Sequence, residues 1–520
     1  MQRNVLEYLW ERLEHMPQKV ALQDDKREVR FCDVQREALQ LARVFHGNGG
    51  QQTRPPRPIL LYLPSDSRCI SAMMGALYSG DFYVPVPTKY PFSWIQKVLQ
   101  NLQPEWIVTD LENVPSLVKN GVPLRKIVLL EDVVQSNPPD ESEEAFFRAL
   151  AGKRLDTDPV YVMYTSGSTG VPKGVVITHR GVIDYIDWAR AFFGVNADFV
   201  LGSATNFSFD NSILDIYLML STGAKMVIFP STPERKNPGT WLDFLNRNRV
   251  NFVFWVPFYL KWLAGERAFD QQVPRFLTHV LFCGEVMPNR ALNYWRKTLP
   301  NVLFANLYGP TEITDACSCY VVDRGFSDEE PLPIGKACAN TEILLLDEQD
   351  RLAGLGEEGE ICVRGSCLSP GYWNNPGKTG EVFVQNPTNP HFPQTIYRTG
   401  DLGMWNEHGE LLFLGRKDFQ IKFLGLRIEP GEIENAVLGM ADVQQSCAVL
   451  TRADAENDPA GGRIALFYVA RREIAPEEFI RYLVHKIPAI PTKFLRLEQF
   501  PLTPSGKTDR KALLRMLGGN

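Results

Sequence analysis

The chain has 520 residues, and at roughly 150 residues per domain this length predicts about three domain-sized cores. Hydrophobic residues make up 44% and charged residues 22% of the chain, an ordinary composition that excludes a mainly disordered protein. The 55 lysines and arginines against 61 aspartates and glutamates give a net charge of −6, so no basic surplus indicates a nucleic-acid or membrane-surface partner.

Membrane and redox signals are weak. No apolar run approaches the roughly 18 residues that span a bilayer, so we expect no membrane insertion. The amino terminus is amphipathic, carries acidic residues and does not resemble a secretory signal. The nine cysteines are scattered, without a Cys-x-x-Cys pair. We therefore interpret them as reduced core thiols of a cytoplasmic protein.

Over the first 340 residues, short apolar runs alternate with helical patterns. Apolar residues at helical spacing occur at 5–13, 212–223 and 289–299. The short runs, typical of buried strands, lie at 59–63, 82–86, 106–110, 126–130, 225–229, 252–256, 279–283 and 302–308. Buried strands that alternate with helices predict an α/β fold of layered, mainly parallel sheets.

The pattern changes towards the carboxyl terminus. Short strand-like segments at 341–347, 359–365 and 409–415 predict a β-rich subdomain at about 335–417. A boundary near 415–418 would separate a large domain, 1–417, from a small, mobile α+β lid domain, 418–520. That last stretch is long enough for a core of its own.

The most informative segment is 164–174, YTSGSTGVPKG, which follows an apparent strand at 160–163. Its hydroxyl side chains and glycines provide donors and a backbone that can curl around an anion, and Lys173 adds positive charge. It is not a Walker A loop, because Val171 and Pro172 separate Gly170 from the lysine. Composition alone leaves a flexible surface loop as the alternative.

Segment 164–174 resembles the phosphate-binding signature of the adenylate-forming superfamily. This superfamily includes acyl-CoA synthetases, luciferases and the adenylation domains of nonribosomal peptide synthetases. Further segments resemble its other core motifs in the same order, at 78–86, 206–212, 306–312, 359–361 with 371–373, 397–401, 415–422 and 504–511. Ordered matches that cover nearly the whole chain are poorly explained by chance.

The resemblance implies an ATP-dependent reaction in two halves, in which a carboxylate forms an acyl-adenylate and a thiol then displaces AMP. The implied catalytic residues are Lys507, Glu312, Lys173 and Thr165, with Glu312 holding Mg²⁺ on the phosphates. The implied ATP-binding residues are Thr165, Ser166, Gly167, Ser168, Thr169, Gly170, Gly284, Glu285, Asn306, Tyr308, Gly309, Thr311, Asp401, Arg416 and Lys507. Without the other motifs, Lys507 would read as a solvated lysine in a basic tail.

Asp418 falls where the family has a hinge that changes which face of the small domain meets the active site. Lys507 would serve adenylation, and the face near Lys422 and Gly425 would serve thiol attack. One departure is visible. Where many relatives carry a basic residue before the glycine, this chain has Leu424, which puts a docking or phosphopantetheine contact in doubt.

Asp210 is the most diagnostic substrate residue. In amino-acid-activating relatives, the matching aspartate pairs with the α-ammonium group of the substrate. The alternative is an N-cap for the helix that follows. Positions implied for the side-chain pocket are Asn211, Leu214, Trp255, Leu281, Cys283, Leu307, Asp315 and Ala316. The bulk of Trp255, Leu281 and Leu307 predicts a shallow pocket and a small amino acid.

Segments 207–217, 282–288 and 415–434 resemble the D-alanine–carrier protein ligases of teichoic acid D-alanylation, so D-alanine is the favoured substrate. Asp315 weakens this assignment, because a buried carboxylate beside a methyl group is costly. Serine, threonine, L-alanine or a diamino acid, handled by a peptide-synthetase-type enzyme, is the alternative. No carrier-type serine motif follows residue 511, so we expect a monomer that loads a separate phosphopantetheinyl carrier protein. An acyl- or aryl-CoA synthetase and a non-catalytic nucleotide-binding protein are the other readings.

Overall fold

The structure is a computed structural model that describes residues 2–47, 54–167, 171–230, 237–328, 330–417, 421–423, 426–451, 463–501 and 508–517, with backbone only at 421–423, 426–427 and 511. Among these residues, no helix is long and apolar enough to cross a membrane. The nine cysteines are all described, and none forms a disulfide.

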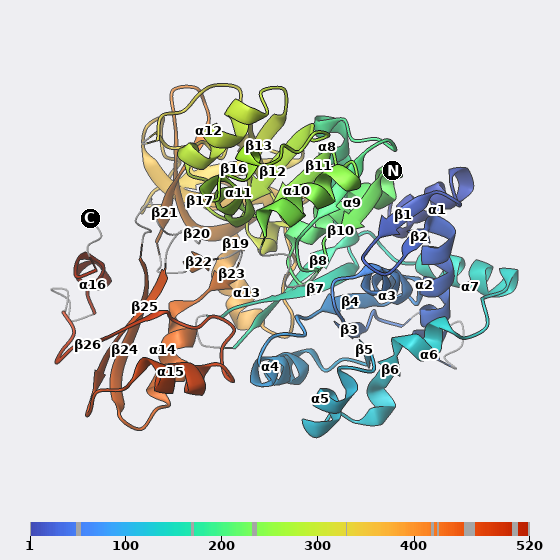
Figure 1. Cartoon of the computed structure of the whole chain (residues 1–520), viewed down its shortest axis with the longest axis horizontal. Coiled ribbons are helices and arrows are strands. Elements are labelled where there is room, and N and C mark those ends of the chain that lie inside the picture. The colour runs from blue at the N-terminus through green and yellow to red at the C-terminus, as the bar shows by residue number, and fades with distance from the viewer. Residues whose placement is uncertain are drawn as a thin grey trace.

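Two large sheets form the centre of the fold (Figure 1). The first has the strand order β15-β14-β13-β12-β11-β9-β10-β1-β2, and the second has the order β18-β8-β7-β4-β3-β5-β6. The first sheet contains β1 (Val20–Gln23), β2 (Glu28–Arg30), β9 (Val200–Ser203), β10 (Lys225–Ile228), β11 (Phe252–Trp255), β12 (His279–Cys283), β13 (Leu303–Tyr308), β14 (Ser318–Val321) and β15 (Lys336–Ala337). The second contains β3 (Pro58–Tyr62), β4 (Phe82–Pro85), β5 (Trp106–Thr109), β6 (Ile127–Leu129), β7 (Pro159–Thr165), β8 (Lys173–Thr178) and β18 (Gly371–Tyr372).

Helices lie between the two sheets and on both outer faces. The inner core joins residues of both sheets to α1 (Leu6–His15), α2 (Phe31–His46), α3 (Ser67–Tyr78), α6 (Leu130–Val134), α7 (Glu141–Ala151), α8 (His179–Phe193) and α9 (Asn211–Thr222). A second core packs the outer face of the first sheet against α10 (Pro238–Arg247), α11 (Pro257–Gly265) and α12 (Asn289–Thr298). A third covers the second sheet with α4 (Phe92–Leu102) and α5 (Val114–Lys119).

This burial on both faces explains the sequence pattern. Strands covered by helices on both sides read as continuous apolar runs, and each run predicted in the first 340 residues coincides with a strand that pairs in parallel with a neighbour. Helix α9 is buried all round and ends at Gly223, whose φ of 77° is the left-handed conformation that favours glycine at this position. The predicted layered α/β architecture is confirmed.

The β-rich part follows as predicted. It is a five-stranded sheet of β16 (Thr341–Leu346), β17 (Glu358–Gly365), β19 (Phe383–Gln385), β20 (Thr395–Trp405) and β21 (Leu411–Arg416), with α13 (Pro376–Val382) beside it. Its own apolar cluster also includes Tyr308 and Ile313, so it packs directly against the end of β13. The β-rich sheet therefore covers one side of the region where β13 ends.

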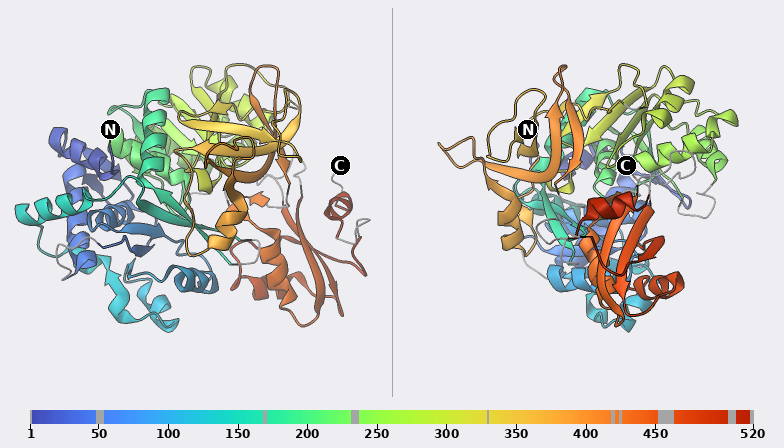
Figure 2. Two further views of the ribbon diagram at one scale, coloured as in Figure 1. Left: turned by 180° about the vertical axis from the view of Figure 1, so that it is seen from behind. Right: turned by 90° about the vertical axis from the view of Figure 1, so that its left-hand side faces the viewer.

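The C-terminal elements pack together at one end of the molecule (Figure 2). They are β22 (Ile421–Phe423), β23 (Leu426–Ile428), α14 (Pro430–Leu438), β24 (Val443–Thr451), β25 (Arg463–Ala470), α15 (Pro476–Leu483), β26 (Lys493–Arg496) and α16 (Arg510–Arg515). A separate core, drawn only from residues after 427, holds α14 and α15 on the β24–β25–β26 sheet. The Ser93 hydroxyl, at the start of α4, donates to the His485 carbonyl at 2.8 Å. The boundary at 417/418 stays a prediction, and Asp418 lies outside the described residues.

Candidate active site

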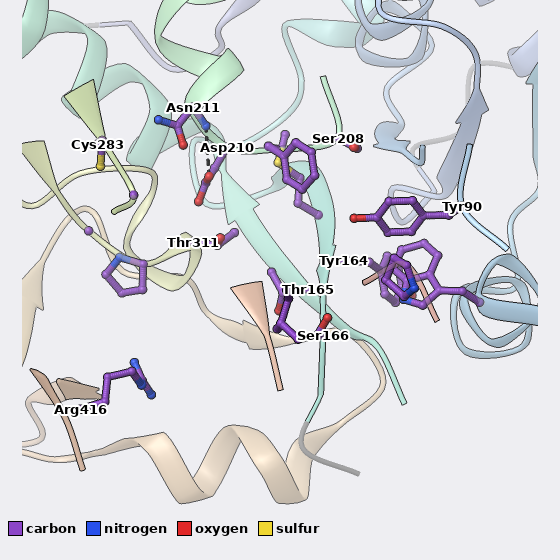
Figure 3. Close-up of a pocket in the computed structure, with 18 residues that line it drawn as sticks. Tyr90, Tyr164, Thr165, Ser166, Ser208, Asp210, Asn211, Cys283, Thr311 and Arg416 are labelled. Carbon is purple, nitrogen blue, oxygen red and sulfur yellow. Dashed lines mark hydrogen bonds between the residues drawn. The ribbon is translucent and has the colours of Figure 1, made fainter. Parts of the chain in front are cut away.

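A cavity opens where strands of both large sheets end (Figure 3). Strand β7 ends at Thr165, β12 at Cys283 and β13 at Tyr308, and carboxyl ends of parallel strands are where α/β proteins bind ligands. The lining residues are Tyr90, Trp94, Met163, Tyr164, Thr165, Ser166, Ser208, Phe209, Asp210, Asn211, Cys283, Gly284, Gly309, Pro310, Thr311, Arg416, Ile428 and Pro488. Segments far apart in the sequence thus converge on one pocket.

The predicted phosphate loop begins at the rim of this pocket. Strands β7 and β8 form an antiparallel hairpin in which Thr165 pairs with Lys173, and the turn between them carries Gly167. A Cβ atom at Gly167 would lie 2.0 Å from the carbonyl oxygen of Val171, so only glycine allows this close approach. The hydroxyl of Thr165 is buried without a hydrogen-bond partner. An unsatisfied donor at a glycine-rich turn fits an anionic ligand.

Glu312 is fully buried just after β13. Its Oε1 accepts a hydrogen bond from the Tyr372 hydroxyl at 2.7 Å, and the Lys173 ammonium lies 5.2 Å from the centre of the Tyr372 ring. Glu312, Tyr372 and Lys173 therefore form one cluster beside the start of β8, next to Thr165 in the hairpin. Among the described residues, no three or more His, Cys, Asp or Glu side chains are arranged so that they could hold a metal ion by themselves. A single carboxylate fits Mg²⁺ that is held mainly by substrate phosphates.

The predicted nucleoside residues form a network at the edge of the β-rich sheet. Asp401 accepts from the Tyr308 hydroxyl at 2.5 Å and from the Arg416 guanidinium at 2.5 Å. Burial and the charge of Asp401 raise the pKa of Tyr308, so its hydroxyl keeps its proton. Asn306 donates from Nδ2 to the carbonyl of Pro333 at 2.8 Å. Arg416 lines the pocket, whereas Asp401 and Asn306 are not among its lining residues.

Asp210 and Asn211 lie at the opposite end of the cavity, beside Cys283 (Figure 3). The Asp210 carboxylate accepts from the backbone N–H of Asn211 at 3.0 Å. An N-cap side chain normally satisfies the second or third N–H of a helix, but the N–H groups of Ser212 and Ile213 bond to backbone carbonyls here. The capping role is therefore minor, and the Asp210 carboxylate is placed at the pocket surface.

The predicted side-chain pocket residues divide between two faces of the first sheet. Leu214, Leu281, Cys283, Leu307 and Ala316 belong to the inner core, on the side of α9. Trp255 does not.

The ring of Trp255 lies in the outer core against Trp241, and its Nε1 donates to the Gly202 carbonyl at 2.9 Å. The prediction for Trp255 was wrong, because successive strand residues point to opposite faces. Phe254 shares the inner face with its β12 partner Leu281.

Asp315 lies on the inner side as well, and it is 1% exposed. Its Oδ2 accepts from the Tyr185 hydroxyl at 2.9 Å. Burial, and then the nearby charge of Asp210, raise the pKa of Asp315 well above its usual value. Because its carboxyl feels the charge of Asp210, Asp315 is close to the pocket end that Asp210 lines.

Three further residues predicted for the ATP site, Gly284, Thr311 and Glu285, are placed by the structure. Gly284 lines the pocket with a φ of 98°, which a larger residue would adopt only with strain. Thr311 lines it also, on the short turn after Gly309. Glu285 forms an ion pair with Lys261 at 2.9 Å, and both side chains are largely buried. Its carboxylate therefore has a structural partner away from the cavity lining.

Several lining residues carry no motif signal. Tyr90 and Trp94 stack edge to face, 5.0 Å apart, at the start of α4. Ile428 and Pro488 come from the C-terminal elements. Glu432, at the start of α14, is 5% exposed, and its pKa is raised by burial and lowered in part by a hydrogen bond from Ser166. In this arrangement, a carboxylate of the C-terminal unit thus reaches the phosphate loop.

Some predicted residues lie outside the described residues. These are Ser168, Thr169 and Gly170 of the phosphate loop, the hinge Asp418, Leu424, Gly425 and the catalytic Lys507. Their roles stay predictions.

Comparison with known proteins identifies the chain. The profile of the AMP-binding enzyme family matches residues 9–373. The chain belongs to the AMP-binding enzyme family. It is an AMP-forming ligase of the adenylate-forming superfamily. The ATP-binding expectation therefore rests on the family as well as on the cavity.

Relatives differ in how much of their length is matched. Tyrocidine synthase 1 of Brevibacillus parabrevis is 32% identical over 505 residues, which are 97% of this chain and 44% of that protein. The chain thus spans less than half of that synthetase. Zwittermicin A synthase ZmaJ of Bacillus cereus is 30% identical over 517 residues, 98% of this chain and 94% of that protein.

The fold is shared with a solved structure of the Vibrio cholerae adenylation domain AlmE in complex with glycyl-adenosine-5'-phosphate. The TM-score is 0.83 at 22% identity, over 100% of this chain and 98% of that chain. The predicted fold class is confirmed by this match.

Proposed function

We propose that this enzyme activates an amino acid as its aminoacyl-adenylate and passes the aminoacyl group to the phosphopantetheine thiol of a carrier protein. The observation that carries the proposal is one cavity whose lining includes both the Asp210 carboxylate and the hydroxyl residues Thr165 and Ser166. A carboxylate suits an α-ammonium group, and hydroxyls at a glycine-rich turn suit phosphates. The substrate carboxylate would then lie between Asp210 and the hydroxyls of Thr165 and Ser166, next to the α-phosphate of ATP.

In the first half-reaction, a substrate carboxylate oxygen bonds to the α-phosphorus of ATP and the bond to pyrophosphate breaks. Thr165 would donate a hydrogen bond from its hydroxyl to the phosphates. The positive charge of Lys173 would offset the negative charge of the phosphates. Mg²⁺ bound at Glu312 would neutralise phosphate charge. We assign the bridging cation to Lys507, which lies outside the described residues.

In the second half-reaction, the carrier thiolate attacks the aminoacyl carbonyl and the bond to AMP breaks. The C-terminal elements already reach the cavity through Ile428 and Pro488, which supports a role for them in presenting the thiol. Solved structures with this fold include holo-PA1221, described as containing adenylation and PCP domains, at a TM-score of 0.83. We propose a carrier protein as the partner on these grounds.

Two substrate candidates each have an observation in their favour. The segment 282–288 favours D-alanine through its resemblance to D-alanine–carrier protein ligases. The buried Asp315 favours an amino acid whose side chain can pair with a carboxyl group. We prefer the second candidate, because a buried carboxyl group beside a methyl group has no partner to offset its desolvation.

The test of the activity is amino-acid-dependent exchange of labelled pyrophosphate into ATP, followed by loading of a phosphopantetheinylated carrier. We expect exchange with at least one amino acid and no turnover with fatty or aryl acids and CoA. Lys507→Ala should abolish exchange without changing the urea unfolding midpoint, and Asp210→Ala should reduce discrimination against acids that lack the amine. Turnover of an acid and CoA, with no exchange on any amino acid, would overturn the proposal.

A further inference from the structure

Asp315 lies within electrostatic reach of two other aspartates, one of which, Asp210, lines the cavity. Asp315 feels the charges of both Asp210 and Asp215. Asp210 lines the cavity, whereas Asp215 is 0% and Asp315 is 1% exposed. Within the part of the chain that the structure describes, no basic side chain acts on either buried carboxyl group. Among the described residues, no cation therefore offsets these two acids in the apolar interior.

Asp315 is fixed just behind the cavity wall. Its carbonyl oxygen packs on Gly309, which lines the cavity, so closely that a Cβ atom there would lie 2.4 Å away. Thr314 and Asp315 both have positive φ, at 60° and 75°, a conformation uncommon for residues other than glycine. The Tyr185 hydroxyl donates a hydrogen bond to the carboxyl group of Asp315. The fold thus holds this carboxyl group in place at a local conformational cost.

Asp215 continues the polar path from the cavity into the interior. It lies four residues after Asn211 on α9, so the two side chains share one face of the helix. Asn211 lines the cavity and is 7% exposed, and its Nδ2 has no hydrogen-bond partner. Neither oxygen of Asp215 has a well-formed hydrogen bond, although Ser203 lies beside it. Buried polar groups without partners are rare in native proteins, so Asn211 and Asp215 are candidates for contacts with a polar ligand group.

Burying a carboxylate without a cation costs several kcal/mol, and a fold can offset this cost in two ways. One is a proton on the carboxyl group, and burial does raise the pKa of Asp215 to about 8. The other is a cation from a ligand. A hydroxyl group can donate one hydrogen bond, but an ammonium group carries three donors and a charge, which matches the acceptors of two carboxyl groups.

We propose that the substrate is a diamino acid, whose side-chain ammonium pairs with Asp315 and Asp215 while its α-ammonium pairs with Asp210. This inference rests on the proposed function, because it names the substrate class of the same adenylation site. No covalent step is added, since the second ammonium acts only in binding. The site would reject amino acids of equal length that lack the second amine, because they leave the acids buried and unpaired.

The experiment is the pyrophosphate exchange assay with matched pairs of both enantiomers. Each diamino acid (2,3-diaminopropionate, 2,4-diaminobutyrate, ornithine and lysine) is compared with the amino acid of equal chain length that lacks the side-chain amine (alanine, 2-aminobutyrate, norvaline and norleucine). We expect one diamino acid to exceed its partner in kcat/KM by about 100-fold or more, as for a buried charge pair that loses one member.

Variants assign the effect to the pocket. Asp315→Asn should cost the preferred diamino acid about 100-fold in kcat/KM while changing its amine-free partner less than about three-fold. Tyr185→Phe, which removes only the hydroxyl bound to Asp315, should cause a smaller loss in the same direction. Asp270→Asn, an exposed and remote aspartate, is the matched control and should change neither substrate.

The outcomes separate the inference from the function on which it rests. Exchange that peaks on alanine, glycine, serine or threonine, with no gain from a second amine, would overturn the diamino acid inference and leave adenylation intact. Exchange with no amino acid would overturn the proposed function. Equal losses for both members of a pair in Asp315→Asn, with an unchanged unfolding midpoint, would also overturn the pairing.

Discussion

Replacing Trp255 by phenylalanine tests the assignment of strand faces around the pocket. The side chain of Trp255 is 0% exposed and donates to the Gly202 carbonyl at 2.9 Å. Phenylalanine removes this hydrogen bond, worth about 1 kcal/mol, and leaves space from the smaller ring that costs about 1 kcal/mol more. We expect the free energy of unfolding in urea to fall by about 2 kcal/mol. Because the ring faces the outer core, amino acid preference should not change.

Phe254→Leu is the matched change on the neighbouring residue. Phe254 is also fully buried, but it shares the inner face with Leu281. We expect its loss of stability to be about 1 kcal/mol, while the ratio of kcat/KM between the substrate and its next longer homologue changes about ten-fold, the effect of one methylene group in a pocket. Pyrophosphate exchange kinetics, measured with the substrate and with its longer homologue, give this ratio of kcat/KM. A changed ratio in Trp255→Phe with an unchanged ratio in Phe254→Leu would refute the face assignment.

Further predictions concern titration and the phosphate site. Since the pKa of Asp215 is raised to about 8, the folded state keeps a proton that the unfolded state loses, so stability should fall by about 1.4 kcal/mol per pH unit between about pH 4 and 8. Asp215→Asn should remove this pH dependence of stability. If the unfolding free energy changed with pH by the same slope in the original protein and in the variant, the prediction would be contradicted. Tyr308→Phe removes the hydroxyl bound to Asp401. We expect the KM for ATP to rise about ten-fold at similar kcat. An unchanged KM for ATP would mean that Tyr308 and Asp401 lie outside the nucleotide site. Glu432→Gln removes a negative charge facing Ser166, so the KM for pyrophosphate should fall about five-fold, and an unchanged KM would mean that this contact does not oppose phosphate binding.

Much of the fold could be predicted from the chain because its signals are local. Buried strands such as β3 and β12 are apolar along their whole length, and α9 is bounded by Asp210 and Gly223. The pocket ends were predictable for the same reason, since Asp210 and Thr165 lie in compact motifs at the ends of regular elements. Local patterns of this kind need no knowledge of the neighbours.

Other parts of the site depend on contacts that no local pattern encodes. Tyr90, Ile428 and Pro488 meet in the cavity because α4 and the C-terminal elements pack together. Glu432 belongs to a recognised segment, but its role at Ser166 follows only from how the C-terminal unit lies on the loop. Residues that act through such long-range packing leave no periodic signal in the sequence, since their chain neighbours are unrelated to their spatial neighbours.

The case of Trp255 shows why motif spacing can fail by one residue. In a strand with one face in water, polar residues alternate with apolar ones and reveal which face is which. Strand β11 is Phe-Val-Phe-Trp and is covered on both faces, so its pattern contains no such alternation. A shift of one residue then exchanges the inner and outer faces without changing the fit to any hydrophobic pattern. The strand pairing resolves this. Phe254 pairs with Leu281, and Leu281 shares its face of β12 with the pocket residue Cys283, two positions later. Phe254 is therefore the aromatic ring that faces the substrate.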